Sequence, residues 1–334
     1  PEHLQSHFLA LRPRLFNSDA FWDYWQQMAL PASYEQSVIL HETRFTPYFA
    51  AKGYIWDTYV NTDDLCGVFV NPIMACPAEL LQKRDCPFFK RRSLFTPYAD
   101  ELRRTDGCAA GELYRYVKAH TEFPVDLLLA SLLQTQPMAA LAKNLHWNYV
   151  IAEPAAEVPD LAALGLRLLR YTLPAADPVT DWYNKKASAD ADALLGCAAQ
   201  LFEKKPLLGV LSPALPLWQG CAAARRTQWQ RDARTLAEKA AVPVGSDPLP
   251  APNCGWLLVR EASFLDGIPP CTTQRDAWQL ALTAQAAGYY AAAFETAAQA
   301  AARADVLDVY EADAARPAAV AKHLGRLIKH KLQK

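Results

Sequence analysis

The apolar and polar positions along the chain predict helices that alternate with short buried strands. Ser18 suits a helix N-cap, and a helix from about Glu42 is expected to end at Gly53, a residue suited to a left-handed C-cap. Further helices are predicted at 76–84, 110–120, 124–134, 137–143, 191–206 and 223–241, with one or two alanine-rich helices at 275–304. "YIWDTYV", "LLGVLSPALP" and "GWLLVR" are typical of strands. This alternation predicts an α/β fold.

Proline and alanine concentrate between residues 152 and 180, as they often do in linkers and loop edges. We therefore predict a first domain at 1–151, a linker at 152–180 and a second α/β domain at 181–334. The chain begins with Pro1 inside a dense pattern, which leads us to expect further sequence upstream.

The last residues, "AVAKHLGRLIKHKLQK", place apolar side chains on one helical face and basic side chains on the remainder. A basic amphipathic helix of this kind can lie on an anionic membrane surface. It can equally dock on its own domain and leave its basic face in water. Both interpretations stay open.

Composition restricts the classes of function. The chain has 34 cationic and 35 anionic side chains among 334 residues, so its net charge does not favour a protein that binds nucleic acid through its overall electrostatic attraction. None of its 8 cysteines forms a CxxC pair, which leaves a zinc ribbon or a thioredoxin-like site without support. No stretch resembles a signal peptide, and no apolar run reaches the roughly 20 residues of a membrane span. A cytoplasmic location is the resulting expectation.

Three consecutive cations, Lys90, Arg91 and Arg92, lie within the aromatic stretch "CPFFKRRSLF". Arginine offers a planar fork of donors for phosphate oxygens, lysine adds a point charge, and neighbouring aromatic rings can stack on a sugar or base. The alternative is a strand whose alternate cations are solvated, in which case at most two of the three converge.

Five blocks in order resemble the rhamnan synthesis protein F family, which consists of glycosyltransferase-like proteins of bacterial rhamnose-containing polysaccharides. The blocks are "HLQSHFLALRPRLFNSDAFWDYW", "ILHETRFTPYFAAKGYIWDTYVNTDDL", "CPFFKRRSLFTPYADEL", "HTEFPVDLLLASLL" and "LHWNYVI". Stretches of the second half, such as "LFEKKPLLGVLSPALPLW", are similar to the C-terminal portion of that family. The resemblance implies a GT-A-like, Rossmann-like architecture that is N-terminally incomplete in this sequence.

The resemblance also implies transfer of a sugar, with rhamnose from its dTDP-activated form as the candidate, to a lipid-linked glycan at the inner face of the membrane. The rival interpretation is a non-catalytic glycan-binding or scaffold module derived from such a transferase. Six tryptophans are candidates either for the core or for sugar stacking: Trp22, Trp25, Trp56, Trp147, Trp218 and Trp256.

Glu42, in "LHETRF", is the candidate general base for a sugar hydroxyl in an inverting transfer. Its position at a predicted helix start also allows simple stabilisation of the helix dipole. His41 beside it is a candidate to contact the donor or acceptor, although a histidine in this place is more often a structural hydrogen-bonding residue than a catalyst. Gln5 and Ser6, in the first resembling block, are candidates to line the donor or acceptor cleft.

The remaining candidates concern phosphate and metal. Lys185 and Lys186, in "YNKK", are candidate phosphate contacts, with a solvated loop as the simpler alternative. Mg²⁺ or Mn²⁺ is a candidate cofactor that no motif establishes, and two acidic pairs are possible ligands: Asp63 with Asp64, and Asp190 with Asp192. Turn and cap roles are the favoured interpretation of both pairs.

Overall fold

The computed structural model describes residues 3–65, 71–96, 107–155, 157–172, 191–214, 219–245, 249, 255–301 and 304. The chain divides into two compact units, which are treated separately below. The first contains Pro1–Val70 and Glu79–Phe88, and the second contains Asn71–Ala78 and Phe89–Lys334. The predicted linker at 152–180 stays a prediction.

The first unit is helical in its described part. Its elements are α1 (Pro13–Phe16), α2 (Asp19–Gln26), α3 (Tyr34–Ser37), the π-helical segment η1 (Val38–Glu42), α4 (Thr43–Ala50) and the 3₁₀ segment η2 (Asp63–Leu65). The Ser18 hydroxyl accepts a hydrogen bond from the Phe21 backbone N–H at 3.2 Å, which confirms the predicted N-cap. Gly53 has a φ of 81°, as expected of a left-handed residue that follows a helix.

Aromatic rings form the core of the first unit. Phe21 of α2 and Phe45 and Phe49 of α4 are buried, and leucines and tyrosines pack around them. Phe21 and Phe49 lie 6.3 Å apart between ring centroids, and Phe45 and Phe49 lie 4.9 Å apart. Because α2 and α4 contribute all three rings, their packing holds the unit together.

The strand predicted for "YIWDTYV" is wrong: residues 54–60 form no strand. Ile55 is 99% exposed and Tyr59 is 81% exposed, so the alternating side chains cover no core. Alternation is compatible with a strand, but a strand also needs a partner for its backbone groups, and this segment has none among the described residues.

The helices predicted for the middle of the chain are confirmed within a few residues. The observed helices and short helical segments are α5 (Pro72–Ala75), α6 (Pro77–Lys83), η3 (Arg91–Leu94), α8 (Ala109–His120), α9 (Val125–Thr135) and α10 (Met138–Leu145). α9 and α10 separate at Gln136 and Pro137, where proline has no N–H to continue the first helix. Leu129 and Leu132 of α9 and Leu141 of α10 are completely buried, so both helices contribute to the core of the second unit.

A mixed five-stranded sheet forms the centre of the second unit. Its strands are β1 (Tyr149–Ala152), β2 (Leu166–Arg170), β3 (Leu208–Pro213), β4 (Trp256–Arg260) and β5 (Tyr290–Thr296), in the order β1-β5-β3-β4-β2. β5 runs parallel to β1 and β3, whereas β4 runs antiparallel to β3 and β2. The predicted α/β class and two of the predicted strands, β3 and β4, are confirmed.

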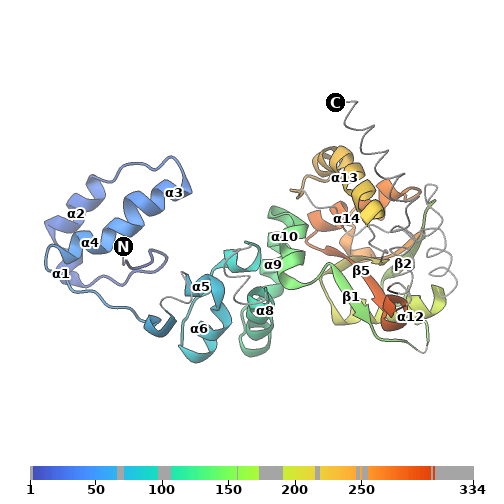
Figure 1. The fold of residues 1–334 in the computed structure, drawn as a ribbon, viewed down its shortest axis with the longest axis horizontal. Coiled ribbons are helices and arrows are strands. Elements are labelled where there is room, and N and C mark those ends of the chain that lie inside the picture. The colour runs from blue at the N-terminus through green and yellow to red at the C-terminus, as the bar shows by residue number, and fades with distance from the viewer. Residues whose placement is uncertain are drawn as a thin grey trace, which may run out of the picture. The chain divides into compact units, whose positions relative to one another are not determined.

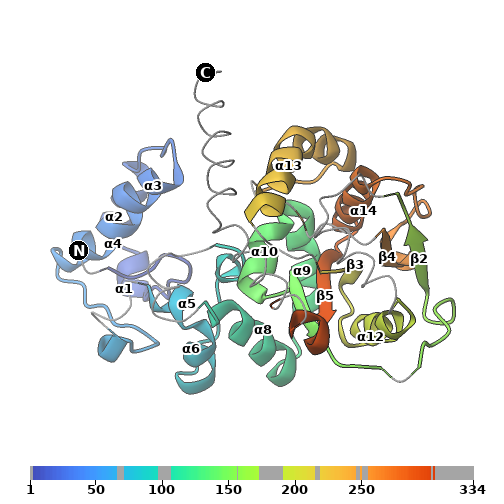
Figure 2. The ribbon, with the colours of Figure 1, turned by 45° about the vertical axis from the view of Figure 1, so that its right-hand side comes forward.

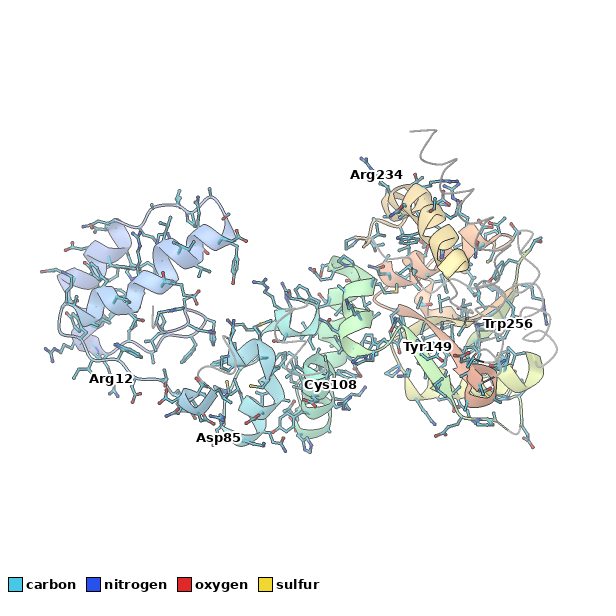
Figure 3. All side chains as sticks on the ribbon, in the orientation of Figure 1. Arg12, Asp85, Cys108, Tyr149, Arg234 and Trp256 are labelled. Carbon is cyan, nitrogen blue, oxygen red and sulfur yellow. The ribbon has the colours of Figure 1, made fainter. Side chains whose placement is uncertain are left out.

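Helices cover both faces of this sheet. They include α12 (Ala191–Lys204), α13 (Gln219–Ala240) and α14 (Gln274–Ala286), and the 3₁₀ segment η4 (Glu261–Ser263) follows β4. α14 lies on one side of the strands and α12 on the other (Figures 1 and 2). All residues of β3 are accordingly buried. Trp256 lies within this layered region and Tyr149 on the edge strand β1 (Figure 3).

The alanine-rich helix predicted over 275–304 is only partly correct. α14 ends at Ala286, and "YAAAFET" forms the inner strand β5 instead. Gly288, with a φ of 85°, reverses the chain between the two elements. Ala291 and Ala292 are buried in β5, where small side chains let the covering elements approach the sheet closely.

One cysteine near the start of α14 is predicted to react slowly. Burial raises the pKa of the Cys271 thiol to about 11, and the nearby Asp276 carboxylate adds to the shift. Roughly one Cys271 thiol in a thousand is then ionised at pH 8. We expect iodoacetamide to label Cys271 at least about tenfold more slowly than the exposed Cys108, as measured by mass spectrometry of the peptides. Equal labelling rates would contradict this environment for Cys271.

Candidate functional site

Glu42 lies inside a continuous helical stretch and not at its start. The Ser33 hydroxyl accepts from the Gln36 N–H at 3.2 Å, so the helix begins at Tyr34 and runs through η1 into α4. The predicted α-helix from about Glu42 is observed as α4, but helical backbone precedes it. Glu42 therefore does not stand at a free helix N-terminus, and the explanation by the helix dipole, which acts only in the first turn, does not apply. Glu42 is instead the last residue of a π-helical segment, a feature frequently found at functional sites.

The N-terminal segment contacts the Glu42 carboxylate. The Ser6 hydroxyl donates to Glu42 Oε2 at 3.1 Å, and His3 Nε2 lies 3.8 Å from Glu42 Oε1. The Leu4 N–H donates to Thr46 Oγ1 at 2.9 Å, which fixes this segment along α4. The structure thus brings the predicted residues Ser6 and Glu42 together, and Gln5 lies half-buried between the anchored Leu4 and Ser6.

The carboxylate keeps access to solvent. The Glu42 side chain is 22% exposed and the His3 side chain 27% exposed. A carboxylate with this access can still receive a proton from an external hydroxyl, while Ser6 holds one of its oxygens in place. His3 was missed in the sequence, although it stands in the same block as Gln5 and Ser6.

His41 makes contacts of a structural kind. Its Nε2 lies 2.7 Å from the carbonyl oxygen of Ala29, which requires a proton on that nitrogen. Its own carbonyl accepts from the Tyr24 hydroxyl at 3.0 Å. His41 therefore links the π-helical segment to the loop after α2 and to α2 itself, in agreement with a structural role.

The cationic turn, residues 90–92, belongs to the second unit and is not a strand. Lys90 is extended, and Arg91 and Arg92 begin the 3₁₀ segment η3. Consecutive side chains on a 3₁₀ turn point about a third of a turn apart, so the two-faced alternation of a strand does not apply. Arg91 is exposed, whereas Lys90 and Arg92 are half-buried and make contacts within the protein.

Buried neighbours hold the cationic turn in place. Leu94 is completely buried, and its carbonyl accepts from Asn144 Nδ2 at 3.3 Å. The Ser93 hydroxyl donates to the Ile73 carbonyl, also at 3.3 Å. The backbone that carries Arg91 is thus fixed by α5 and α10, which lowers the entropic cost of binding an anion there.

In the acidic pair Asp63 and Asp64, the Asp64 carboxylate is bound by an arginine side chain. Arg84 donates to both carboxylate oxygens of Asp64, at 2.6 and 2.7 Å, and its Nη2 lies 3.5 Å from Glu79. The hydrogen bond from Arg84 lowers the pKa of the exposed Asp64 carboxyl. Asp63 accepts from Asn61, at the start of the 3₁₀ segment η2. These contacts agree with the favoured turn role of Asp63 and Asp64.

Several predicted features lie outside the described residues, namely Lys185, Lys186, Asp190 and the C-terminal helix at 319–334, and the side chain of Asp192 is likewise not described. Within the described ranges, no group of three or more His, Cys, Asp or Glu side chains is arranged to hold a metal ion. In the same ranges, no helix combines the length and the apolar character that crossing a bilayer requires.

The described elements define an α/β protein, and one comparison relates its first half to proteins of rhamnan synthesis. Residues 1–162 match the family model described as rhamnan synthesis protein F. This match over the first 162 residues supports the resemblance to that family found in the sequence. Searches among curated proteins and among solved structures gave no match.

Proposed function

We propose that the protein transfers a sugar in the synthesis of a bacterial surface polysaccharide of the rhamnan, capsule or O-antigen type. The donor in this proposal is a nucleotide-sugar such as dTDP-rhamnose, and the acceptor is a lipid-linked glycan. A GT-A-like architecture with a second α/β domain, a cytoplasmic location and peripheral membrane contact through the C-terminal helix belong to the same proposal. The match of residues 1–162 to the rhamnan synthesis protein F model supports a role in polysaccharide synthesis, and the contacts of Glu42 support its role as general base.

The observation that carries the proposal is the placement of Glu42. A hydroxyl of the acceptor attacks the anomeric carbon of the donor, and the bond from that carbon to the diphosphate breaks with its electron pair on the departing nucleoside diphosphate. The acceptor proton passes to the Glu42 carboxylate. Ser6 restrains this carboxylate at 3.1 Å while leaving it partly open to solvent.

The departing diphosphate needs a positive partner. Arg91 is exposed on a turn fixed by buried neighbours, and a charge-assisted contact with phosphate is among the stronger hydrogen bonds available to a side chain. Lys90 and Arg92 flank it, and Lys185 and Lys186 are proposed as further contacts. A bound Mg²⁺ or Mn²⁺ would add charge at the same group.

Calorimetric titration with dTDP and UDP, with and without Mg²⁺ or Mn²⁺, tests the donor site. We expect Arg91→Ala to weaken nucleotide binding about tenfold or more, since one phosphate contact is lost. Arg234→Ala is the matched control, because Arg234 is an exposed arginine of the same unit on α13 (Figure 3). Binding that is equally insensitive to both substitutions would remove the cationic turn from the donor site.

A second candidate function is a non-catalytic glycan-binding or scaffold module. The observation in its favour is that the Glu42 carboxylate already accepts a hydrogen bond from Ser6 and lies near His3, as a purely structural carboxylate would. A chain of this kind would bind glycan without binding dTDP or UDP. The titration described above separates it from a transferase.

A further inference from the structure

Two tryptophans of α2 remain largely outside the core of the first unit. Trp22 is 50% exposed and Trp25 is 42% exposed, whereas Phe21 between them in the fold is only 5% exposed. Residues three apart share a helix face, so the two indoles are neighbours on the surface. Large aromatic rings held at a surface frequently mark an interaction site.

Other rings fix the two indoles in position. The ring centroids of Phe21 and Trp22 lie 5.5 Å apart, with an angle of 84° between the ring planes. The centroids of Phe16 and Trp22 lie 5.7 Å apart, with an angle of 61°. Trp25 makes comparable contacts with Phe21, at 5.9 Å and 69°, and with Tyr24, at 5.7 Å and 89°. These edge-type contacts restrain the indoles while leaving ring surface open, so a ligand meets preorganised rings.

The charges of α2 indicate the chemistry of the ligand. The helix reads "DAFWDYWQ" and contains two aspartates and no cation, and both Asp19 and Asp23 are exposed. Acidic side chains beside the rings disfavour an anionic membrane surface. Carboxylates can accept hydrogen bonds from the hydroxyl groups of a sugar, and its C–H faces pack on aromatic rings.

We propose that Trp22 and Trp25, with Asp23 between them in the sequence, form a binding subsite for a neutral glycan. This inference rests on the proposed function and specifies where the growing acceptor chain is held. α2 packs against the helical stretch that contains Glu42. The ring centroids of Trp25 and Phe45 lie 6.3 Å apart, and Phe45 follows Glu42 by about one turn. The Tyr24 hydroxyl donates to the carbonyl of His41. The subsite and the carboxylate therefore belong to one packed unit.

Titration of the full chain with a neutral rhamnose polymer, followed by calorimetry in the absence of any nucleotide-sugar, tests this subsite. Trp22→Ala and Trp25→Ala are each expected to weaken binding at least about tenfold. Trp56→Ala is the matched control, because Trp56 is 37% exposed in the same unit but outside α2. Far-UV circular dichroism verifies that each variant folds, and Trp22→Phe is expected to restore part of the affinity.

Binding that both alanine variants retain, or no binding by the unsubstituted chain, would overturn the subsite. So would a dimer in sedimentation that Trp22→Ala dissociates, because a second copy would then be the occupant of these rings. Transfer to a monosaccharide acceptor distinguishes this inference from the proposed function. Failure of the proposed function would show as no transfer by the unsubstituted chain even when polymer binding is intact. Failure of the subsite would instead show as transfer that proceeds while both alanine variants bind the polymer as well as the unsubstituted chain does.

Discussion

Replacing Glu42 by Gln is expected to lower the rate of sugar transfer by about 10²–10⁴-fold, the usual contribution of a general base. The amide keeps the size of the side chain and can still accept the hydrogen bond from Ser6, so the helix is expected to stay intact. What it loses is the ability to take the acceptor proton. The measurement is release of nucleoside diphosphate from dTDP-rhamnose in the presence of a glycan acceptor.

Glu35→Gln supplies the matched control for this experiment. Glu35 lies in the first turn of the same helical stretch and is exposed, so the substitution removes one negative charge without touching the carboxylate that Ser6 holds. It is expected to leave the transfer rate within about twofold of the original. A Glu42→Gln protein as active as the Glu35→Gln protein would exclude Glu42 as the base.

Replacing Gln285 by Leu is expected to destabilise the second unit by about 3 kcal/mol. Gln285 is completely buried, and its Nε2 lies within hydrogen-bonding distance of the carbonyls of Leu133, Gln136 and Pro243, at 2.9, 3.1 and 3.2 Å. The two N–H bonds of this α14 side chain are thus shared among carbonyls at the end of α9, at the break before α10 and after α13. Leucine has a similar volume but donates nothing, so these buried acceptors lose their partner.

Urea denaturation followed by circular dichroism measures the free energy of unfolding. Gln279→Leu is the control, because Gln279 lies on the same helix and is 9% exposed but makes none of these three bonds. We expect it to change stability by less than about 1 kcal/mol. If Gln285→Leu were as mild as Gln279→Leu, water or rearranged carbonyl contacts would have to replace the amide.

Features with local causes were predictable from the sequence. Ser18 caps α2 because its hydroxyl reaches the N–H three residues on, and Pro137 separates two helices because it has no N–H to donate. β3 was predictable from the short apolar run at residues 207–211. The cluster around Glu42 was partly predictable: Ser6 and Glu42 stand in separate blocks that resemble one family, but their contact spans 36 residues of sequence.

Features with distant causes were not predictable. Gln285 stands in an alanine-rich stretch that gives no sign of three carbonyl partners, two of which lie about 150 residues away in sequence. Glu42 was expected at a helix start because the Ser33 cap went unrecognised and a π-helical segment has no simple pattern of its own. The sequence pattern at 90–92 is compatible with a strand. In the structure, the burial of Ser93 and Leu94 accompanies a 3₁₀ turn instead.

The sequence by itself determined the α/β class and the positions of most helices, because caps, prolines and apolar periodicity act over a few residues. Only the tertiary structure decided that "YAAAFET" is an inner strand and that "YIWDTYV" is not a strand at all. A strand exists only when distant backbone groups pair with it. β5 finds β1 and β3 as neighbours, and their pairing outweighs the helix preference of its alanines.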